Sequence, residues 1–212
     1  MTARSPGLRA RRSRAVGDDE KAVRRQGILA AAKKVFARDG FQATSMADVA
    51  KAAHVSYGAV YWYFASKDEL FHALMDAEAQ ALRAHIAEAL ASSDGEGAEG
   101  LLRDAVRATF EFFEADRATV KLLFRDSYAL GGRFERHLFG IYEGFIDDLR
   151  GVFVEAQRRG EIVDFPPAVA AFSVAALVGQ LAHRRLSTDD GLDAGVVADF
   201  VVRLLLDGLR PR

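Results

Sequence analysis

Residues 44–71 read TSMADVAKAAHVSYGAVYWYFASKDELF, and this stretch decides the fold. Ser45 opens a short helical segment and has Asp48 three residues later, the spacing of a capping box. Ser56 is placed to cap a second short segment. Two short helices separated by about four residues, behind a longer first helix, predict a helix-turn-helix whose second helix can enter the DNA major groove.

The second of these helices, residues 56–64, is unusually rich in aromatic side chains. Val60 and Phe64 are four positions apart and point inward, which leaves the tyrosines and the tryptophan on other faces. Phenolic hydroxyls can donate to phosphate oxygens, and an aromatic edge can touch a thymine methyl group. Gly58 costs about 1 kcal/mol relative to alanine in a helix interior. The aromatic residues therefore indicate a DNA contact or, alternatively, an interface between a small helical domain and its neighbour.

The composition excludes several classes of protein. The chain has 212 residues, of which 50% are hydrophobic, and it has no cysteine. A disulfide framework, a thiolate metal site and a cysteine nucleophile are therefore ruled out. The N-terminus lacks the apolar stretch of an export signal, and the most apolar run, residues 168–179, is too short to span a bilayer. We expect a cytoplasmic protein that does not enter a membrane.

Charge is distributed unevenly along the chain. Residues 1–68 carry 13 Lys and Arg against 6 Asp and Glu, whereas residues 69–212 carry 16 against 24. A basic first third followed by an acidic remainder is typical of a polyanion-binding end attached to a domain that avoids polyanions. Residues 1–17 mix Arg, Ser, Gly and Pro without periodicity, so we predict a disordered basic arm there.

The rest of the chain has helical periodicity, and the predicted fold is all-α. We expect a three-helix DNA-binding domain with a helix-turn-helix at 18–66, followed by a larger helical domain at 67–212. A long fourth helix runs to about Ala91, and the segment 92–100, SSDGEGAEG, is a flexible linker. Further helices are predicted near 101–115, 117–130, 134–158, 167–186 and 193–209.

The quoted stretch resembles the signature of the TetR (tetracycline-repressor-like) family of bacterial regulators, and the resemblance extends over about residues 20–75. One position departs from the family pattern, because His54 stands in the turn where glycine is usual and a left-handed backbone is expected. Histidine is one of the residues that tolerate positive φ. The matching residues are Thr44, Ser45, Val49, Ala50, Ala53, Val55, Ser56, Gly58, Val60, Tyr61, Tyr63, Phe64, Ser66, Lys67 and Leu70.

The resemblance implies a homodimeric, sequence-specific DNA-binding transcriptional regulator that a small, largely apolar effector releases from a palindromic operator. It also implies that the 67–212 domain serves effector binding and dimerisation. The role most common in the family is repression. Carried over position by position, the expected phosphate contacts are Ser45, Tyr61 and Lys67. The residues expected to touch bases or the adjoining backbone are Ala47, Tyr57, Gly58, Ala59, Trp62 and Tyr63. The polar residues expected to orient the effector are Arg125, Tyr128, His137 and Tyr142.

The last two predicted helices have apolar faces suited to a four-helix bundle across a two-fold axis, although an intramolecular core would also explain them. Gly140 and Gly144 lie on one face of the 134–158 helix, where they indicate either close helix packing or room for a ligand. The residues of the apolar faces are Ala168, Ala171, Phe172, Ala175, Ala176, Gly179 and Ala182 on the first helix, and Val197, Phe200, Val201, Leu204 and Leu205 on the second.

An enzyme and a sequence-indifferent DNA-binding protein are the two alternatives to a sequence-specific regulator. For an enzyme, the sequence offers five scattered histidines, a single Glu69-x-x-His72 without a second copy, no Gly-x-Ser-x-Gly elbow and no phosphate loop. We therefore expect no enzymatic activity, metal or cofactor. A sequence-indifferent DNA-binding protein that uses the arginine arm would show steep salt dependence and little preference between DNA sequences.

Overall fold

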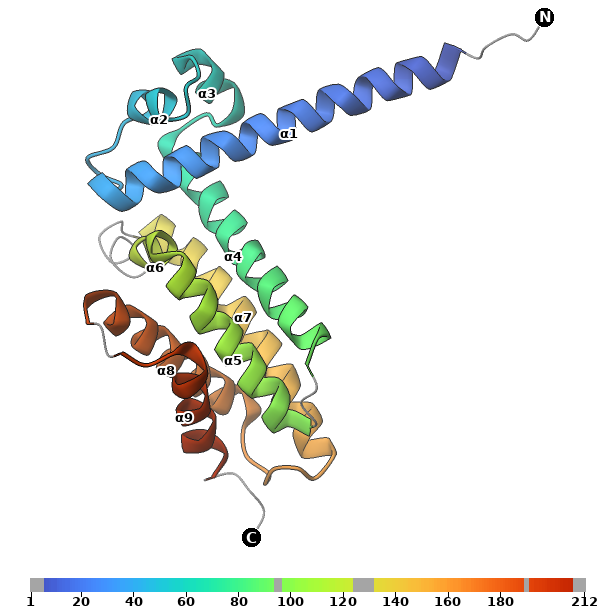
Figure 1. Cartoon of the computed structure of the whole chain (residues 1–212), viewed down its shortest axis with the longest axis vertical. Helices are drawn as coiled ribbons and strands as arrows, with labels where there is room; N and C mark the ends of the chain where they lie inside the picture. The colour runs from blue at the N-terminus through green and yellow to red at the C-terminus, as the bar shows by residue number, and fades with distance from the viewer. Residues whose placement is uncertain (1–5, 94–96, 124–131, 189–190, 208–212) are drawn as a thin grey trace, which may run out of the picture. The chain divides into compact units, whose positions relative to one another are not determined.

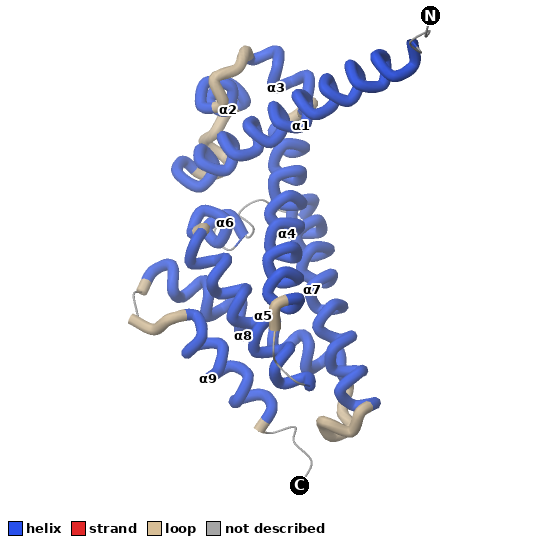
Figure 2. The backbone as a smooth tube through the Cα atoms, turned by 45° about the vertical axis from the view of Figure 1, so that its right-hand side comes forward, coloured by secondary structure: helices blue, strands red, loops and turns tan. Residues whose placement is uncertain are grey.

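The computed structural model describes residues 6–93, 97–123, 132–188 and 191–207. Within these ranges every regular element is a helix, which confirms the predicted all-α fold (Figure 1, Figure 2). In chain order the helices are α1 (Pro6–Asp39), α2 (Met46–Ala52), α3 (Tyr57–Tyr63), α4 (Lys67–Ala91), α5 (Gly97–Ala115), α6 (Arg117–Lys121), α7 (Gly132–Arg158), α8 (Pro167–Ser187) and α9 (Ala194–Leu206).

The chain divides into two compact units, an N-terminal unit of residues 1–74 and a C-terminal unit of residues 75–212. The division falls within α4, so this helix begins in one unit and ends in the other. The sequence analysis placed the division at 66/67, just before the same helix. In either description, α4 is the continuous segment that links the helix-turn-helix to the rest of the chain.

The N-terminal unit has an aromatic core. Phe36 of α1, Phe41 beyond its end and Phe71 of α4 are buried, with ring centroids 5.1 to 5.7 Å apart. Tilted and edge-to-face pairs at such distances add about 0.5–1.5 kcal/mol each to the stabilisation from area burial. Val60 and Phe64 are buried as well, which confirms that this i, i+4 pair points inward. The core holds α2 and α3 together, and α2 also packs on α1.

Side-chain caps define where the short helices begin. The Ser45 hydroxyl accepts a hydrogen bond from the backbone N–H of Asp48 at 3.2 Å, and the Asp48 carboxylate accepts one from the Ser45 N–H at 2.9 Å. This is the predicted capping box, which satisfies two backbone donors that the helix cannot. Ser56 caps α3 by accepting from the Ala59 N–H, and Ser66 caps α4 by accepting from the Glu69 N–H.

The C-terminal unit is a helical bundle in which α5 packs on α9 and α7 packs on α8 (Figure 2). Its core takes buried apolar side chains from every long helix of the unit. Representatives are Leu82 of α4, Phe110 of α5, Phe153 of α7, Val174 of α8 and Val201 of α9.

Two helix boundaries differ from the prediction. The predicted disordered arm is helical from Pro6, since α1 extends from there to Asp39. Alanine, leucine and arginine are good helix formers, and they predominate in LRARRSRA (8–15) over the turn-forming residues that suggested disorder. α5 begins at Gly97, inside the predicted linker, because the Glu161 carboxylate accepts from the Ala98 N–H at 2.7 Å and stabilises the first turn. The predicted 117–130 helix begins as α6, and most of the remainder lies outside the described residues.

Within the described parts of the chain, no helix is both long enough and apolar enough to cross a membrane. Among the same residues, no three His, Asp or Glu side chains gather in a way that could hold a metal ion.

Candidate nucleic-acid interface

The turn between α2 and α3 has the geometry that the sequence analysis expected. His54 adopts a φ of +54°, in the left-handed region. The N–H of His54 donates to the carbonyl of Lys51 at 3.3 Å, and the N–H of Val55 donates to the carbonyl of Ala50 at 3.1 Å. These two bonds form a Schellman motif, whose left-handed position is normally glycine. The expected left-handed backbone is confirmed, and histidine occupies it at some cost in free energy.

α3 presents its aromatic side chains to solvent. Tyr57, Tyr61 and Trp62 are 55%, 41% and 65% exposed, and Tyr63 is half-buried. The rings of Tyr57 and Tyr61 pair with centroids 4.7 Å apart, and a hydrogen bond to Tyr61 raises the pKa of Tyr57 above its ordinary value. The helix therefore carries a row of exposed aromatic groups that the core of the N-terminal unit does not use.

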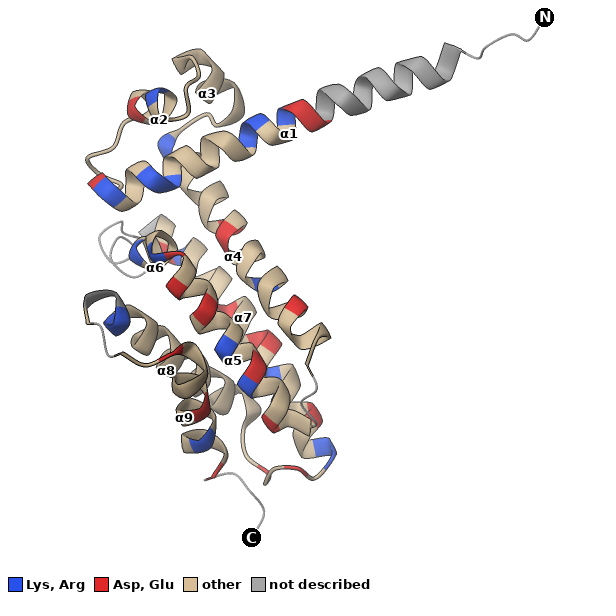
Figure 3. Ribbon diagram, viewed as in Figure 1, with Lys and Arg blue, Asp and Glu red and all other residues tan. Residues whose placement is uncertain are grey.

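Gly58 is not required by the fold of the chain. A Cβ atom added there would meet nothing within 4 Å, and its φ is not positive. Ala59 beside it is half-buried, so this end of α3 offers a small, open surface. α3 also carries no charged residue, whereas Lys and Arg recur along the described part of α1 (Figure 3). A close approach to the backbone of α3 is thus open at Gly58.

The start of α2 contributes two further predicted residues. Ser45 and Ala47 are both exposed. The Ser45 hydroxyl donates to Asp48 Oδ2 at 2.6 Å in addition to its capping role. That bond lowers the pKa of Asp48 below its ordinary value, with the Ser45 backbone N–H adding to the effect. A phosphate that took a hydrogen bond from the Ser45 hydroxyl would compete with this carboxylate.

Lys67, the third predicted phosphate contact, is surrounded by backbone carbonyls of its own unit. Its Nζ lies 2.7 Å from the carbonyl oxygen of Phe41, 3.2 Å from that of Gln42 and 2.8 Å from that of Thr44. Nζ also lies 4.4 Å from the centroid of the Phe41 ring. All three ammonium protons therefore have partners within the N-terminal unit.

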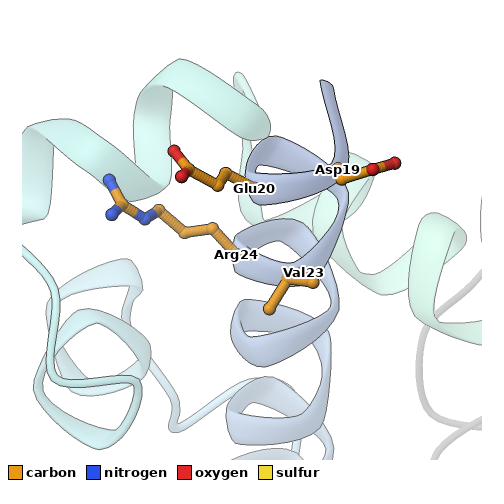
Figure 4. Close-up of a pocket in the computed structure, with 4 residues that line it drawn as sticks. All are labelled: Asp19, Glu20, Val23 and Arg24. Carbon is orange, nitrogen blue, oxygen red and sulfur yellow. The ribbon is translucent and has the colours of Figure 1, made fainter. Parts of the chain in front are cut away.

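Cations of α1 lie beside aromatic rings at the end of α3 and at its C-cap. Lys21 Nζ is 5.7 Å from the Trp62 ring and the Arg25 guanidinium is 5.0 Å from the Phe64 ring, within the range of cation–π attraction. In the same part of α1 a shallow depression of about 440 Å³ is lined by Asp19, Glu20, Val23 and Arg24 (Figure 4). These four residues include none of those predicted to bind the effector.

Two of the four predicted effector-binding residues fall within the described structure. Arg125 and Tyr128 lie outside the described residues. His137 of α7 pairs with Asp76 of α4, with Nε2 2.9 Å from the carboxylate. Tyr142 is half-buried, and its ring lies 6.4 Å from that of Phe172 of α8.

His85 of α4 is a candidate that the sequence analysis missed. Its Nε2 atom is buried, and no hydrogen-bond partner for it lies among the described residues. Its ring is 5.9 Å from that of Phe112 of α5, and Ile86 and Phe112 belong to the partly buried apolar side chains that surround the core. A single polar atom in an apolar setting is the arrangement that orients a mostly apolar ligand. Its position between Leu82 and Ile86 on the inner face of α4 was the available signal.

The structure distinguishes between the two explanations of the apolar faces of α8 and α9, which are a dimer interface and an intramolecular core. Ala171, Ala182, Val197 and Val201 are buried within the chain, so the intramolecular-core alternative holds for these residues. Other apolar side chains of the same two helices remain about half exposed or more. They are Val169 and Phe172 on α8 and Val196, Phe200 and Leu204 on α9, called the α8–α9 stripe below.

A capped helix-turn-helix with exposed aromatic residues, followed by a larger helical bundle, is an architecture found in helical DNA-binding proteins. The sequence profile of bacterial regulatory proteins of the tetR family matches residues 28–74. Residues 28–74 therefore match this family, as the resemblance implied, and the proteins to which the chain is similar are transcriptional regulators.

Relatives and solved structures agree with this assignment. The HTH-type transcriptional regulator TtgR of Pseudomonas putida is 28% identical over 184 residues, which cover 82% of this chain and 86% of that protein. The HTH-type transcriptional repressor BepR of Brucella suis is 26% identical, over 90% of this chain and 94% of that one. The transcriptional regulator FadR from Bacillus subtilis, solved with stearoyl-CoA, superposes with a TM-score of 0.78 at 20% identity, over 86% of this chain and 98% of that one. The last comparison supports the fold of both units.

Proposed function

We propose that the protein is a homodimeric repressor that binds a palindromic operator through α3 and leaves it when a small, largely apolar effector binds the C-terminal unit. The observation that carries the proposal is the exposed surface of α3. Tyr57, Tyr61 and Trp62 are exposed there without contributing to the core, and Gly58 leaves the backbone open between them. A major-groove contact accounts for both features.

The residues proposed to contact DNA fall into two groups. Ser45 and Tyr61 have hydroxyl groups that can donate to phosphate oxygens. The base-edge contacts, or contacts to the adjoining backbone, are assigned to Ala47, Tyr57, Gly58, Ala59, Trp62 and Tyr63. Lys67 differs from both groups because its ammonium already donates to three carbonyls.

Selection of bound duplexes from a random DNA pool at physiological salt, followed by sequencing, tests the DNA-binding part. We expect a palindrome whose half-sites lie one helical turn, about 34 Å, apart. Tyr61→Phe should weaken binding to that duplex because it removes one hydroxyl, whereas Tyr142→Phe in the C-terminal unit is the matched control and should not. Recovery of no motif, with binding lost as salt rises, would support the sequence-indifferent alternative instead.

The dimer is proposed to form through α8 and α9. The α8–α9 stripe is apolar and exposed on the single chain, and a two-fold axis would bring each stripe against its copy. Two recognition helices are also needed, because one short helix reads too few base pairs for a specific operator.

The effector is proposed to bind in the C-terminal unit with one polar group at His85 Nε2 and its apolar part among the half-buried side chains near Phe112. Because α4 runs from the N-terminal unit into this one, an effector that shifts α4 would change operator affinity. Linkage then requires that DNA weaken effector binding by the same factor.

Calorimetry with stearoyl-CoA, the ligand of the Bacillus subtilis FadR structure, provides a first probe of this site. We expect binding that His85→Leu weakens, with release of the selected duplex when the probe is added. Binding that leaves duplex affinity unchanged would contradict the coupling for that ligand.

A further inference from the structure

The carbonyls around Lys67 belong to one short loop. Residues 40–45 connect the end of α1 to the start of α2, and Gly40 turns the chain there with a φ of +85°. The carbonyl oxygens of Phe41, Gln42 and Thr44 all lie within 3.2 Å of Lys67 Nζ. Carbonyl dipoles that converge on one point repel one another, so the shape of this loop depends on a cation at its centre.

The 40–45 loop leads directly into α2, the first helix of the helix-turn-helix. Thr44 is buried and its hydroxyl donates to the carbonyl of Gly40 at 2.8 Å, which closes the loop around the ammonium. The next residue, Ser45, is the N-cap of α2, and α2 packs on α3. Lys67 itself is the first residue of α4. One ammonium group therefore joins the start of α4 to the segment that positions α2 and α3.

We propose that Lys67 is a positioning residue, which acts on DNA binding by fixing the 41–44 loop and not by contacting phosphate. This inference rests on the proposed function, because it concerns how that function is achieved. To reach a phosphate, the ammonium would exchange three hydrogen bonds inside the protein for new ones outside it. In its present place it holds the helix-turn-helix against the first turn of α4.

Two substitutions separate positioning from phosphate contact. Lys67→Met removes the charge and keeps the length of the side chain. Lys67→Arg keeps the charge and binds phosphate well, but its planar guanidinium does not fit three carbonyls around one point. Lys51→Met is the matched control, because it removes one charge from an exposed position on α2. Affinity for the selected duplex is measured for the dimer over a range of salt concentrations.

Positioning predicts that both Lys67 variants lose affinity by about tenfold, the effect of losing one charged hydrogen bond. It also predicts that the dependence of log affinity on log salt changes no more in Lys67→Met than in Lys51→Met. If Lys67→Arg retains the affinity, and Lys67→Met reduces the salt slope by about 0.9, the loss expected for one phosphate contact, the proposal is overturned.

Hydrogen exchange without DNA gives a readout that does not depend on the proposed function. Backbone amides of residues 41–49 should exchange faster in both Lys67 variants than in the unmodified protein, and Lys51→Met should leave them unchanged. Unchanged exchange in both Lys67 variants would overturn the positioning role even if the protein binds its operator. Faster exchange in a protein that shows no sequence preference would support the positioning role and refute the proposed function alone.

Discussion

The guanidinium of Arg83 in α4 occupies the space beside Gly144 in α7. A Cβ atom on Gly144 would collide with Arg83 Nη2, whereas a Cβ on Gly140, one turn earlier, would meet nothing within 4 Å. Arg83 also donates to Asp148 at 3.1 Å and stacks over the Phe145 ring at 4.5 Å. The space beside Gly144 is therefore taken by the Arg83 side chain, whereas the space beside Gly140 is open.

The contact between Arg83 and Gly144 predicts that substitution by alanine has different effects at Gly140 and Gly144. Gly140→Ala should stabilise the protein by about 0.5–1 kcal/mol through helix propensity alone. Gly144→Ala should gain less, because the new methyl group displaces the Arg83 side chain. Chemical denaturation of both variants, with and without Arg83→Ala, measures the coupling, which should be about 0.5 kcal/mol or more for Gly144. Equal effects at both positions in both backgrounds would contradict the contact.

Gly58 and Gly27 are two further helical glycines at which the effect of alanine can be compared. Both lie in helices, and an added Cβ at either would meet nothing within 4 Å. Alanine at either position should raise the free energy of unfolding by about 0.5–1 kcal/mol. Only Gly58→Ala should weaken operator binding, by about 1–3 kcal/mol, since its methyl group would enter a close-packed interface with DNA. The two variants are compared by denaturation and by duplex affinity, and unimpaired binding by Gly58→Ala would remove Gly58 from the interface.

His54 should carry a measurable conformational cost. Because its φ of +54° favours glycine, His54→Gly is expected to stabilise the N-terminal unit by about 1 kcal/mol. His54→Ala should not stabilise it, since alanine keeps the Cβ atom that causes the strain. The unfolding transition of the N-terminal unit is the measurement, and equal stability of the two variants would show that the left-handed turn costs little.

Local chemistry explains why so much of the N-terminal unit was predictable. The caps at Ser45, Ser56 and Ser66, the inward pair of Val60 and Phe64 and the turn at His54 each depend on neighbours a few residues away. Helix propensity, capping residues and hydrophobic spacing all favoured the same helices there. Structure can be predicted from sequence where such independent signals agree.

Contacts between distant residues explain what the sequence could not provide. The carbonyls that bind Lys67 lie 23 to 26 residues away along the chain, and Glu161, which stabilises the first turn of α5, lies 63 residues from Ala98. Periodicity also could not decide which side of α9 faces the core. Val201 is fully buried and Leu204 is 58% exposed, although both are apolar and belong to the same predicted face.

The capping box at α2 should give a pH-dependent contribution to stability. The Ser45 hydroxyl and backbone N–H hold the pKa of Asp48 below its ordinary value of about 3.9. A lowered pKa in the folded state means that this contribution is complete above about pH 3.9 and is lost as the pH falls through the folded value. In an NMR titration, Ser45→Ala should raise the pKa of Asp48 towards its ordinary value. An unchanged pKa would show that the hydroxyl does not hold the carboxylate in solution.

The α8–α9 stripe should contain the strongest determinant of dimerisation. Phe200 is 59% exposed and lies one turn from both Val196 and Leu204, so a two-fold axis through this region would bury its ring. Phe200→Glu would then place a charge in an apolar interface and should weaken the dimer by about 2 kcal/mol or more, about 30-fold in Kd. Operator binding should fall with it, because a monomer presents a single recognition helix.

Sedimentation equilibrium measures this effect, and Phe139→Glu is its control. Phe139 of α7 is 61% exposed, so the same residue type at nearly equal exposure receives the same charge outside the stripe. A dimer that survives Phe200→Glu, or one that Phe139→Glu disrupts equally, would show that the subunits meet elsewhere. Loss of the dimer in Phe200→Glu alone, with the helical content of both variants unchanged, would place the two-fold axis at α8 and α9.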